Sequence, residues 1–248
     1  MRGLTNRVAL VTGGSRGIGA GVVRALAAEG VRVAFTYVRG VEPAQALVTA
    51  LEQEGGEVLA LQADTAKPTE IRQAVSAVVA HFGQLDILVN NAGVFVHSPV
   101  DEVAPDEEAL AHLWQVNTYG TAQTVRAAVE HLSAGGRIIN IGSGSNIRTP
   151  YAGTSDYAAS KGALAAYTRG WARDLAPRHI TVNIIQPGLI ETDMTPTDSA
   201  TRASLLQPIM LGRFGTAQEV GEVVAFLASE AAGYITGATL NVDGGWSA

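Results

Sequence analysis

The stretch LVTGGSRGIGAG, residues 10–21, places a glycine-rich segment directly after a short apolar run. Gly13, Gly17 and Gly19 allow a sharp turn and a close approach to a ligand, because glycine carries no side chain. A helix that starts here would point free N–H groups and the positive end of its dipole at an anion. The spacing, G-x-x-x-G-x-G, differs from the most common dinucleotide fingerprint, and a purely structural turn is the alternative. We predict that a strand ends here, a helix begins, and a phosphate binds between them.

Short β-branched runs alternate with longer amphipathic stretches along the chain. Because the runs are apolar almost throughout, we expect strands buried on both faces, as in a parallel sheet. Gly30 and Gly83 stand where helix C-caps are expected. The predicted strands are residues 8–12, 33–37, 58–62, 87–90, 137–142, 181–186 and 239–242. The predicted helices include residues 17–29, 43–54, 69–82, 106–132 and 156–175.

This alternation predicts one α/β domain over residues 1–248. Seven strands with helical crossovers imply a Rossmann-type, doubly wound parallel sheet with helices on both faces and right-handed connections. No linker, low-complexity tract or repeat of fixed period interrupts the pattern. Residues 188–215, rich in Thr, Pro and Ser, show no clear element. Because long loops in compact domains often act as lids, we predict a substrate flap there.

The composition excludes several classes of function. The chain has 23 acidic and 17 basic residues, a net charge of −6, which argues against nucleic acid or an anionic membrane as partner. Without cysteine it has no disulfide, thiolate nucleophile or cysteine-bound metal. The five histidines lack ligand spacing, so we expect no metal. The first apolar run is too short to span a membrane and no cleavage site follows, which predicts a cytoplasmic protein.

The end of the second predicted strand indicates which dinucleotide binds. An acid at this position would accept hydrogen bonds from the adenosine ribose of NAD, but the residue here is Tyr37. Arg39 follows it, and Arg16 lies within the glycine turn. Guanidinium groups form bidentate, charge-assisted bonds with phosphate, so the pair suits a 2′-phosphate. We predict NADP(H) as cofactor; two solvated surface arginines are the alternative.

Residues 157–161, YAASK, carry the predicted chemistry. Tyr157 and Lys161 are four positions apart on a predicted helix and therefore share one face. A phenol with its ordinary pKa of about 10 is a poor proton donor at neutral pH, and a nearby ammonium should lower that pKa. We predict that Tyr157 is a general acid for a carbonyl oxygen. The alternative is a half-buried tyrosine beside a lysine that extends to solvent.

Six motifs together resemble the short-chain dehydrogenase/reductase family over essentially the whole chain. They are TGGSRGIG (12–19), NNAG (90–93), NTYG (117–120), IGSGS (141–145), YAASK (157–161) and QPGLIETDM (186–194). The C-terminal YITGATLNVDGG (234–245) also fits. The resemblance is to NADP(H)-preferring carbonyl reductases similar to 3-oxoacyl-carrier-protein reductases. It implies a homotetramer, or a dimer, that associates through the helix 106–132 and the catalytic helix.

The resemblance also implies roles for individual residues. Ser143 would stabilise the substrate oxygen. Ser145 stays an alternative, because the spacing from Ser143 to Tyr157 is one residue longer than in many relatives. Asn117 would hold a proton-relay water, or simply bond to backbone within its helix. Asp64 would meet the adenine, or cap the next helix. The implied cofactor contacts are Gly13, Ser15, Arg16, Gly17, Ile18, Gly19, Tyr37, Arg39, Asp64, Thr65, Asn91, Ala92, Gly93, Tyr157, Lys161, Pro187, Gly188, Ile190 and Thr192.

These residues predict an NADPH-dependent reductase of a small ketone or aldehyde. Its pocket would draw on residues 94–98, 145–154 and 190–210, with Tyr151, Met194 and Leu206 as apolar lining. A carrier-bound acyl substrate is less favoured, because residues 130–137, EHLSAGGR, hold little of the positive charge that an acidic carrier protein needs. A nucleotide-binding sensor with little turnover is the alternative from another class.

Overall fold

The computed structural model describes residues 2–149, 151–193, 195 and 197–248. It contains one parallel sheet of seven strands in the order β3-β2-β1-β4-β5-β6-β7. The order reverses beside β1, which is where a doubly wound sheet opens a ligand crevice. The predicted fold class is confirmed. The strands are β1 (Val8–Val11), β2 (Arg32–Tyr37), β3 (Val58–Gln62), β4 (Leu85–Asn90), β5 (Leu132–Ile141), β6 (Thr181–Pro187) and β7 (Thr239–Val242).

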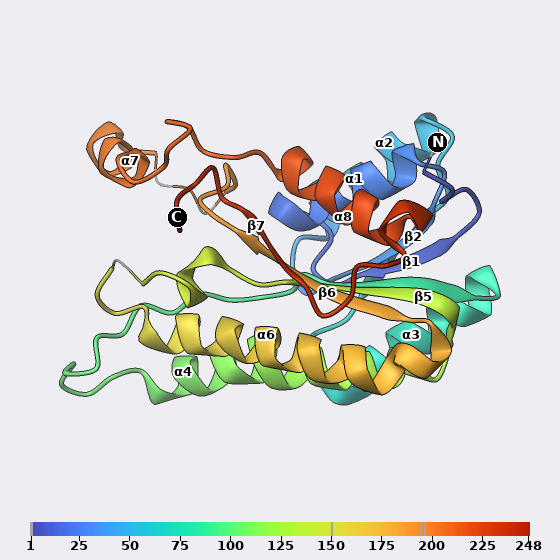
Figure 1. Ribbon diagram of the computed structural model, residues 1–248, viewed down its shortest axis with the longest axis horizontal. Coiled ribbons are helices and arrows are strands. Elements are labelled where there is room, and N and C mark those ends of the chain that lie inside the picture. The colour runs from blue at the N-terminus through green and yellow to red at the C-terminus, as the bar shows by residue number, and fades with distance from the viewer. Residues whose placement is uncertain (1, 150, 194, 196) are drawn as a thin grey trace.

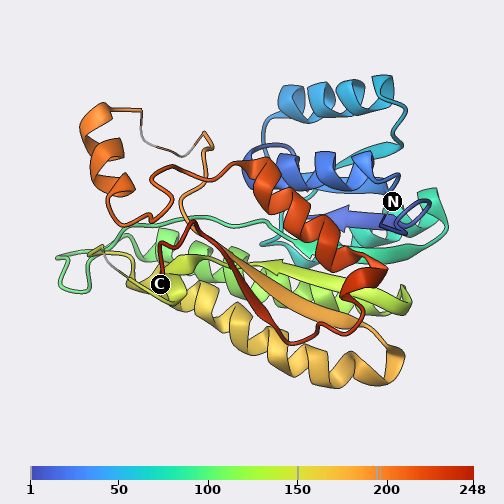
Figure 2. The ribbon, with the colours of Figure 1, turned by 45° about the horizontal axis from the view of Figure 1, so that its top comes forward.

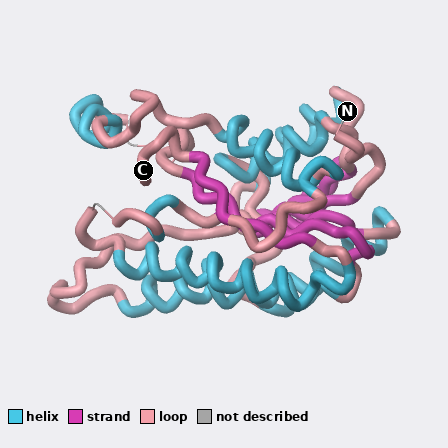
Figure 3. The backbone as a smooth tube through the Cα atoms, in the orientation of Figure 1, coloured by secondary structure: helices cyan, strands magenta, loops and turns pink. Residues whose placement is uncertain are grey.

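Helices cover both faces of the sheet (Figure 1). The upper layer in that view contains α1 (Gly17–Ala28), α2 (Val41–Gln53) and α8 (Ala217–Ala228). The lower layer contains α3 (Pro68–Phe82), α4 (Glu107–Trp114), α5 (Thr121–Val129) and α6 (Ser155–Leu175). The tube in Figure 3 shows the strands enclosed between these layers. Within the described ranges, no helix is long and apolar enough to cross a membrane.

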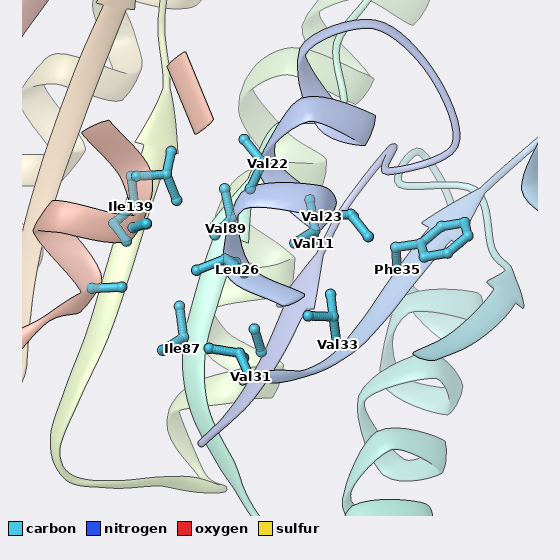
Figure 4. Packing of buried hydrophobic residues seen from close by; sticks show 14 of the residues in the cluster. Val11, Val22, Val23, Leu26, Val31, Val33, Phe35, Ile87, Val89 and Ile139 are labelled. Carbon is cyan, nitrogen blue, oxygen red and sulfur yellow. The ribbon is translucent and has the colours of Figure 1, made fainter. Parts of the chain in front are cut away.

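Two apolar clusters hold the layers on the sheet. On the upper face, Val22 and Leu26 of α1 pack on Val11, Val33 and Ile139 (Figure 4). On the lower face, side chains of α3, α5 and α6 pack on the opposite sides of the same central strands. Complete burial of one such side chain contributes about 1.5–3 kcal/mol to stability, so both faces fix the register of the sheet.

The predicted helix over residues 106–132 is wrong in its continuity. The α-helical hydrogen bonding stops at Trp114, and a π-helical turn, η1 (Gln115–Gly120), separates α4 from α5. The hydroxyl of Thr121 donates to the carbonyl of Asn117 at 3.0 Å, which satisfies an acceptor of this turn. The predicted C-terminal boundary of this helix is also wrong, because α5 ends at Val129 and β5 begins at Leu132, whose backbone pairs with Leu85.

The segment 188–215 contains a helix, contrary to our prediction of a stretch without elements. Helix α7 (Ser199–Leu206) begins after Asp198, whose carboxylate accepts a hydrogen bond from the Thr201 amide at 2.8 Å. An isolated parallel bridge joins Ile190 to Gly215 and closes the base of the segment. Figure 2 shows α7 standing away from the main helical layers, near the C-terminus. The expected lining residue Met194 lies outside the described residues.

Candidate active site

The predicted site residues gather at the carboxyl ends of the parallel strands. The glycine turn is fixed there by β2, since the amide of Gly13 donates to the Thr36 hydroxyl at 3.1 Å and the amide of Gly14 to the Thr36 carbonyl at 2.9 Å. A Cβ added to Gly19 would collide with the carbonyl of Gly13. Gly13 and Gly17 both have positive φ, at 66° and 52°. The turn therefore needs glycine at all three predicted positions.

The start of α1 fits a phosphate group. The N–H groups of its first turn have no intrahelical acceptor, and Ser15, Gly17 and Ile18 lie at this end. The N-cap residue, Arg16, is exposed and makes no side-chain capping bond. Arg39 is also exposed, two residues beyond Tyr37 and β2. Across the described ranges neither guanidinium forms an ion pair, so both are available for a 2′-phosphate.

The chain after β4 is tied to the glycine turn. The side-chain amide of Asn91 donates to the carbonyls of Thr12 and Gly13, each at 2.9 Å. The Thr12 hydroxyl accepts from the amides of Asn91 and Ala92 at 3.0 and 3.1 Å. A Cβ on Gly93 would lie 3.0 Å from the Lys161 Nζ. The predicted segment 91–93 thus connects the glycine turn to Lys161.

Asp64 and Thr65 follow β3 at the same edge. The Asp64 carboxylate accepts a hydrogen bond from the Ala66 amide at 2.9 Å, which forms a local turn. The N-cap of α3 is Lys67, so Asp64 does not cap that helix. Thr65 is buried. The predicted contact of Asp64 with adenine stays a prediction.

Tyr157 and Lys161 lie one turn apart on α6, as predicted. Lys161 is only 4% exposed, and its Nζ donates to the carbonyl of Ile141 at 3.0 Å. Burial lowers the pKa of this ammonium to about 8. The Tyr157 ring is partly buried and meets the Phe95 ring edge to face, with 5.1 Å between centroids.

The predicted net lowering of the Tyr157 pKa is wrong. Burial raises the pKa of the Tyr157 phenol, and a hydrogen bond with Ser143 partly offsets this rise. The Lys161 ammonium directs its hydrogen bond at the carbonyl of Ile141, at the end of β5. The phenol therefore keeps its proton well above neutral pH.

Ser143 is the serine that contacts Tyr157. It directly follows Gly142, whose amide makes the last backbone hydrogen bond between β5 and β6. The Ser143 hydroxyl accepts a hydrogen bond from the Ser145 amide at 3.2 Å. This bond makes Ser143 the N-cap of a short 3₁₀ turn, η2 (Gly144–Asn146). Because Ser145 is the residue whose amide orients the hydroxyl of Ser143, the geometry favours Ser143 for the predicted role.

Asn117 lies inside the π-helical turn and is fully buried. Its side chain accepts from the Val94 amide at 2.8 Å and donates to the Val94 carbonyl at 2.9 Å and the Ser160 hydroxyl at 3.0 Å. These bonds join the loop after β4 to α6. A π-helical turn often marks a functional site, although the water-holding role of Asn117 stays a prediction.

The residues after β6 complete the edge. The amide of Gly188, next to Pro187, donates to the Val242 carbonyl at 3.1 Å. Ile190 is buried at its bridge with Gly215. The methyl group of Thr192 lies 3.4 Å from the position of a Cβ on Gly17, so the base of the segment 188–215 adjoins the glycine turn.

Comparison with known proteins finds relatives of one family along nearly the whole chain. The protein-family model described as Enoyl-(Acyl carrier protein) reductase matches residues 13–247. A solved short-chain dehydrogenase/reductase of Serratia marcescens is 48% identical, with 99% of each chain covered and a TM-score of 0.95. The chain belongs to the short-chain dehydrogenase/reductase family. The family prediction is confirmed.

Two further relatives bear on what family members bind. A short-chain dehydrogenase of Burkholderia cenocepacia, solved in complex with NADP, is 45% identical over 100% of both chains, with a TM-score of 0.93. A curated Escherichia coli protein is 40% identical over 100% of both chains. It is named a cyclic-di-GMP-binding biofilm dispersal mediator protein.

Two contacts of this short-chain dehydrogenase/reductase site escaped the sequence analysis. The Phe95 ring packs on Tyr157, and the Gln186 side chain accepts a hydrogen bond from the Ser143 amide at 2.5 Å. A glutamine near the end of an otherwise mostly apolar strand was the available signal for the second contact. In the part of the chain that the structure describes, no group of three or more His, Asp or Glu residues could hold a metal ion.

Proposed function

We propose that the protein is an NADPH-dependent reductase that converts a small ketone or aldehyde to an alcohol. The observation that carries this proposal is the meeting of Ser143, Tyr157 and Lys161 beside a glycine turn with free N–H groups. A protein that only binds nucleotides has no need of a phenol, a serine hydroxyl and a buried ammonium at one point. The free guanidiniums of Arg16 and Arg39 support NADP(H) over NAD(H).

Bound NADPH supplies the hydride that the carbonyl carbon accepts. The Tyr157 phenol carries its proton at neutral pH, because burial raises its pKa, and it gives this proton to the substrate oxygen. The Ser143 hydroxyl donates a hydrogen bond to the same oxygen as negative charge develops there. The Lys161 ammonium then stabilises the phenolate until solvent returns the proton.

The entrance to the site favours a neutral, apolar substrate. Phe95, Ile147 and Tyr151 are exposed there, with 51%, 49% and 37% of their surfaces accessible. The segments 94–108, 144–156, 188–215 and 243–248 together hold ten acidic and three basic residues. Such a charge repels an acidic carrier protein, so we prefer a free carbonyl compound over a carrier-bound acyl group.

A cyclic-dinucleotide sensor is the second candidate function. The E. coli relative named for cyclic-di-GMP binding favours it, because that protein matches this chain from end to end. Two phosphates of a cyclic dinucleotide could use the same N–H groups and arginines as NADPH. The acidic substrate entrance and the serine–tyrosine–lysine group have no part in such binding, so we rank this candidate second.

We also propose that the protein is a homotetramer, with a dimer as the alternative. A shallow groove of about 400 Å³ runs between α4, η1 and α6 and is lined by aromatic side chains. Among its residues are Trp114, Tyr119 and Tyr167, two of them exposed. Aromatic residues are enriched at the buried centres of protein interfaces.

The experiment that tests the proposal follows NADPH oxidation with a panel of ketones and aldehydes. Tyr157→Phe should abolish turnover and leave NADPH binding within about twofold, because the lost hydroxyl acts on the substrate. Tyr167→Phe, on the same helix but outside the site, is the matched control and should retain full turnover. Tight binding of cyclic-di-GMP without turnover of any carbonyl compound would favour the sensor instead.

A further inference from the structure

The main-chain amide of Ser143 lies one residue beyond the hydrogen bonds of the sheet. The last backbone bond between β5 and β6 runs from the Gly142 amide to the Ile185 carbonyl at 2.8 Å. The next amide, that of Ser143, donates instead to the side-chain oxygen of Gln186 at 2.5 Å. The Gln186 side chain therefore extends the hydrogen bonding of the sheet by one residue, up to the reactive serine.

Gln186 is itself held firmly. It is fully buried within β6, and its backbone lies between β5 and β7, paired with Asn241. Its side chain lies directly on Gly142, where a Cβ would collide with the Gln186 Oε1. The orientation of the amide follows from chemistry, because the N–H of Ser143 can pair only with the oxygen and never with the NH₂ group.

Glutamine is not the residue type that would make the folded state most stable at position 186. Within the described residues, the buried Nε2 of Gln186 has no hydrogen-bond partner. A buried donor without a partner destabilises the folded state, and an apolar side chain of similar size avoids that cost. The glutamine at this position therefore indicates a use for its oxygen that outweighs the unpaired nitrogen.

We infer that Gln186 is a positioning residue, which directs the Ser143 hydroxyl at the substrate oxygen by anchoring the Ser143 backbone. This inference rests on the proposed function. Ser143 has an extended backbone, with φ −163° and ψ 142°, and its hydroxyl accepts a long hydrogen bond of 3.2 Å from the Ser145 amide. Without the Gln186 anchor the turn can rotate, and a displacement of about 1 Å at a catalytic group can reduce the rate up to about 100-fold.

The test compares Gln186→Leu, which has no acceptor, with Gln186→Glu, which keeps one in either protonation state. Residue-resolved hydrogen exchange measures protection of the Ser143 amide without any need for turnover. We expect exchange at Ser143 to rise at least about tenfold in the leucine variant and to return near the wild-type rate in the glutamate variant. The leucine variant should melt near the wild-type temperature, since the loss of the unpaired Nε2 is offset by the loss of the acceptor for the Ser143 amide.

A double-mutant cycle with Ser143→Ala isolates the catalytic part. In the wild-type background, Gln186→Leu should lower kcat about tenfold and change KM less than about twofold. In the Ser143→Ala background, the same change should lower kcat less than about twofold, because no hydroxyl is left to orient.

The possible outcomes separate the two claims. Unchanged exchange at Ser143 in the leucine variant, or an equal loss of kcat in both backgrounds, overturns the inference about Gln186 and leaves the proposed function intact. Undiminished kcat in Ser143→Ala rejects the proposed role of Ser143, and the catalytic purpose of the anchor with it. Loss of exchange protection together with a background-dependent loss of kcat supports both.

Discussion

The chain has two lysines, and their surroundings are opposite. Lys67 is exposed, and its ion pair with Glu70, 2.9 Å long, raises the pKa of its ammonium. Lys161 is buried, and desolvation lowers the pKa of its ammonium from 10.5 to about 8. Only the buried lysine therefore lowers the stability of the folded state when charged. This cost is typical of a group retained for chemistry.

Replacement of Lys161 by Met should stabilise the protein while removing activity. Because its folded pKa lies below its unfolded pKa, the unfolded state binds more protons between pH 8 and 10.5, and the destabilisation fades across that interval. The shift corresponds to about 3 kcal/mol, offset by about 1.5 kcal/mol for the lost bond to Ile141. We expect a gain in the free energy of unfolding of roughly 1–2 kcal/mol at pH 7.

Urea unfolding at pH 7 and at pH 10.5 measures this effect. The advantage of Lys161→Met should disappear at the higher pH, where Lys161 is unprotonated in the folded wild type and only half protonated in the unfolded chain. Lys67→Met is the matched control and should show no gain at pH 7, since Lys67 is solvated. A variant less stable than wild type at pH 7 would show that the ammonium is not destabilising.

The choice of cofactor is also decided at single residues. Replacing Tyr37 and Arg39 together by Asp removes one guanidinium and supplies carboxylates that accept hydrogen bonds from a ribose. We expect the ratio of kcat/KM for NADPH to that for NADH to fall at least about tenfold, as for the loss of one charged hydrogen bond. Arg24→Asp, exposed on α1, is the control. A wild-type enzyme that already prefers NADH would contradict the arginine argument.

Among the elements, α1 and α8 cross through a pair of glycines. A Cβ on Gly221 of α8 would lie 2.5 Å from the carbonyl oxygen of Gly21 and 2.9 Å from the Ala25 side chain of α1. The backbones therefore touch at this crossing, and the glycine turn at the start of α1 is braced by α8. Helix α8 begins with a capping box formed by Thr216 and Glu219.

Gly221→Ala should destabilise the protein, although alanine favours a helix. Helix propensity gives about 1 kcal/mol to the alanine, whereas overpacking against backbone costs about 1–3 kcal/mol. We expect a net loss of roughly 1–2 kcal/mol in urea unfolding. Ser76→Ala, at an exposed position of α3, also raises helix propensity but adds no contact with another helix. It should raise the free energy of unfolding by about a few tenths of a kcal/mol. A gain at both positions would show that the helices can separate at little cost.

The elements also show what the sequence could predict. The strands were predicted closely, except where β5 begins, because apolar residues on both faces mark a central parallel strand. The π-helical turn at Asn117 left no signal, since only the register of its hydrogen bonds distinguishes it from an α-helix. Helix α7 was missed because Ser, Thr and Pro dominate its surroundings. Its cap, Asp198, was visible in the sequence.

The same limit applies to the site. Tyr157 and Lys161 follow from spacing alone, because four residues make one helical turn. The pKa of Tyr157 does not, since it depends on burial and on Ser143, which lies in a different element, at the turn after β5. Gln186 was missed for a related reason. Its function depends on the register between β5 and β6, which sequence periodicity does not specify.

In the whole molecule, the candidate active site and the aromatic groove lie on different parts of the surface. The strand ends hold the site, whereas the groove between α4, η1 and α6 lies on the lower helical layer. Tyr167 and Trp171 stack there with 4.7 Å between ring centroids, and Trp114 and Tyr119 are exposed nearby. Because Asn117 and Tyr157 lie on the elements that border this groove, association through it would stiffen the site.

Ala111→Arg should weaken that association. Ala111 is exposed and lines the groove, so the folded subunit tolerates an arginine there, but a close-packed interface would have to bury its charge. We expect light scattering after gel filtration to give a multiple of 25.7 kDa for the wild type, four-fold for a tetramer, and a smaller species for the variant. Ala46→Arg, exposed on α2 in the opposite layer, makes the same change away from the groove and should keep the wild-type mass. If all three proteins have one mass, the aromatic groove is not an interface, and its exposed rings need another partner.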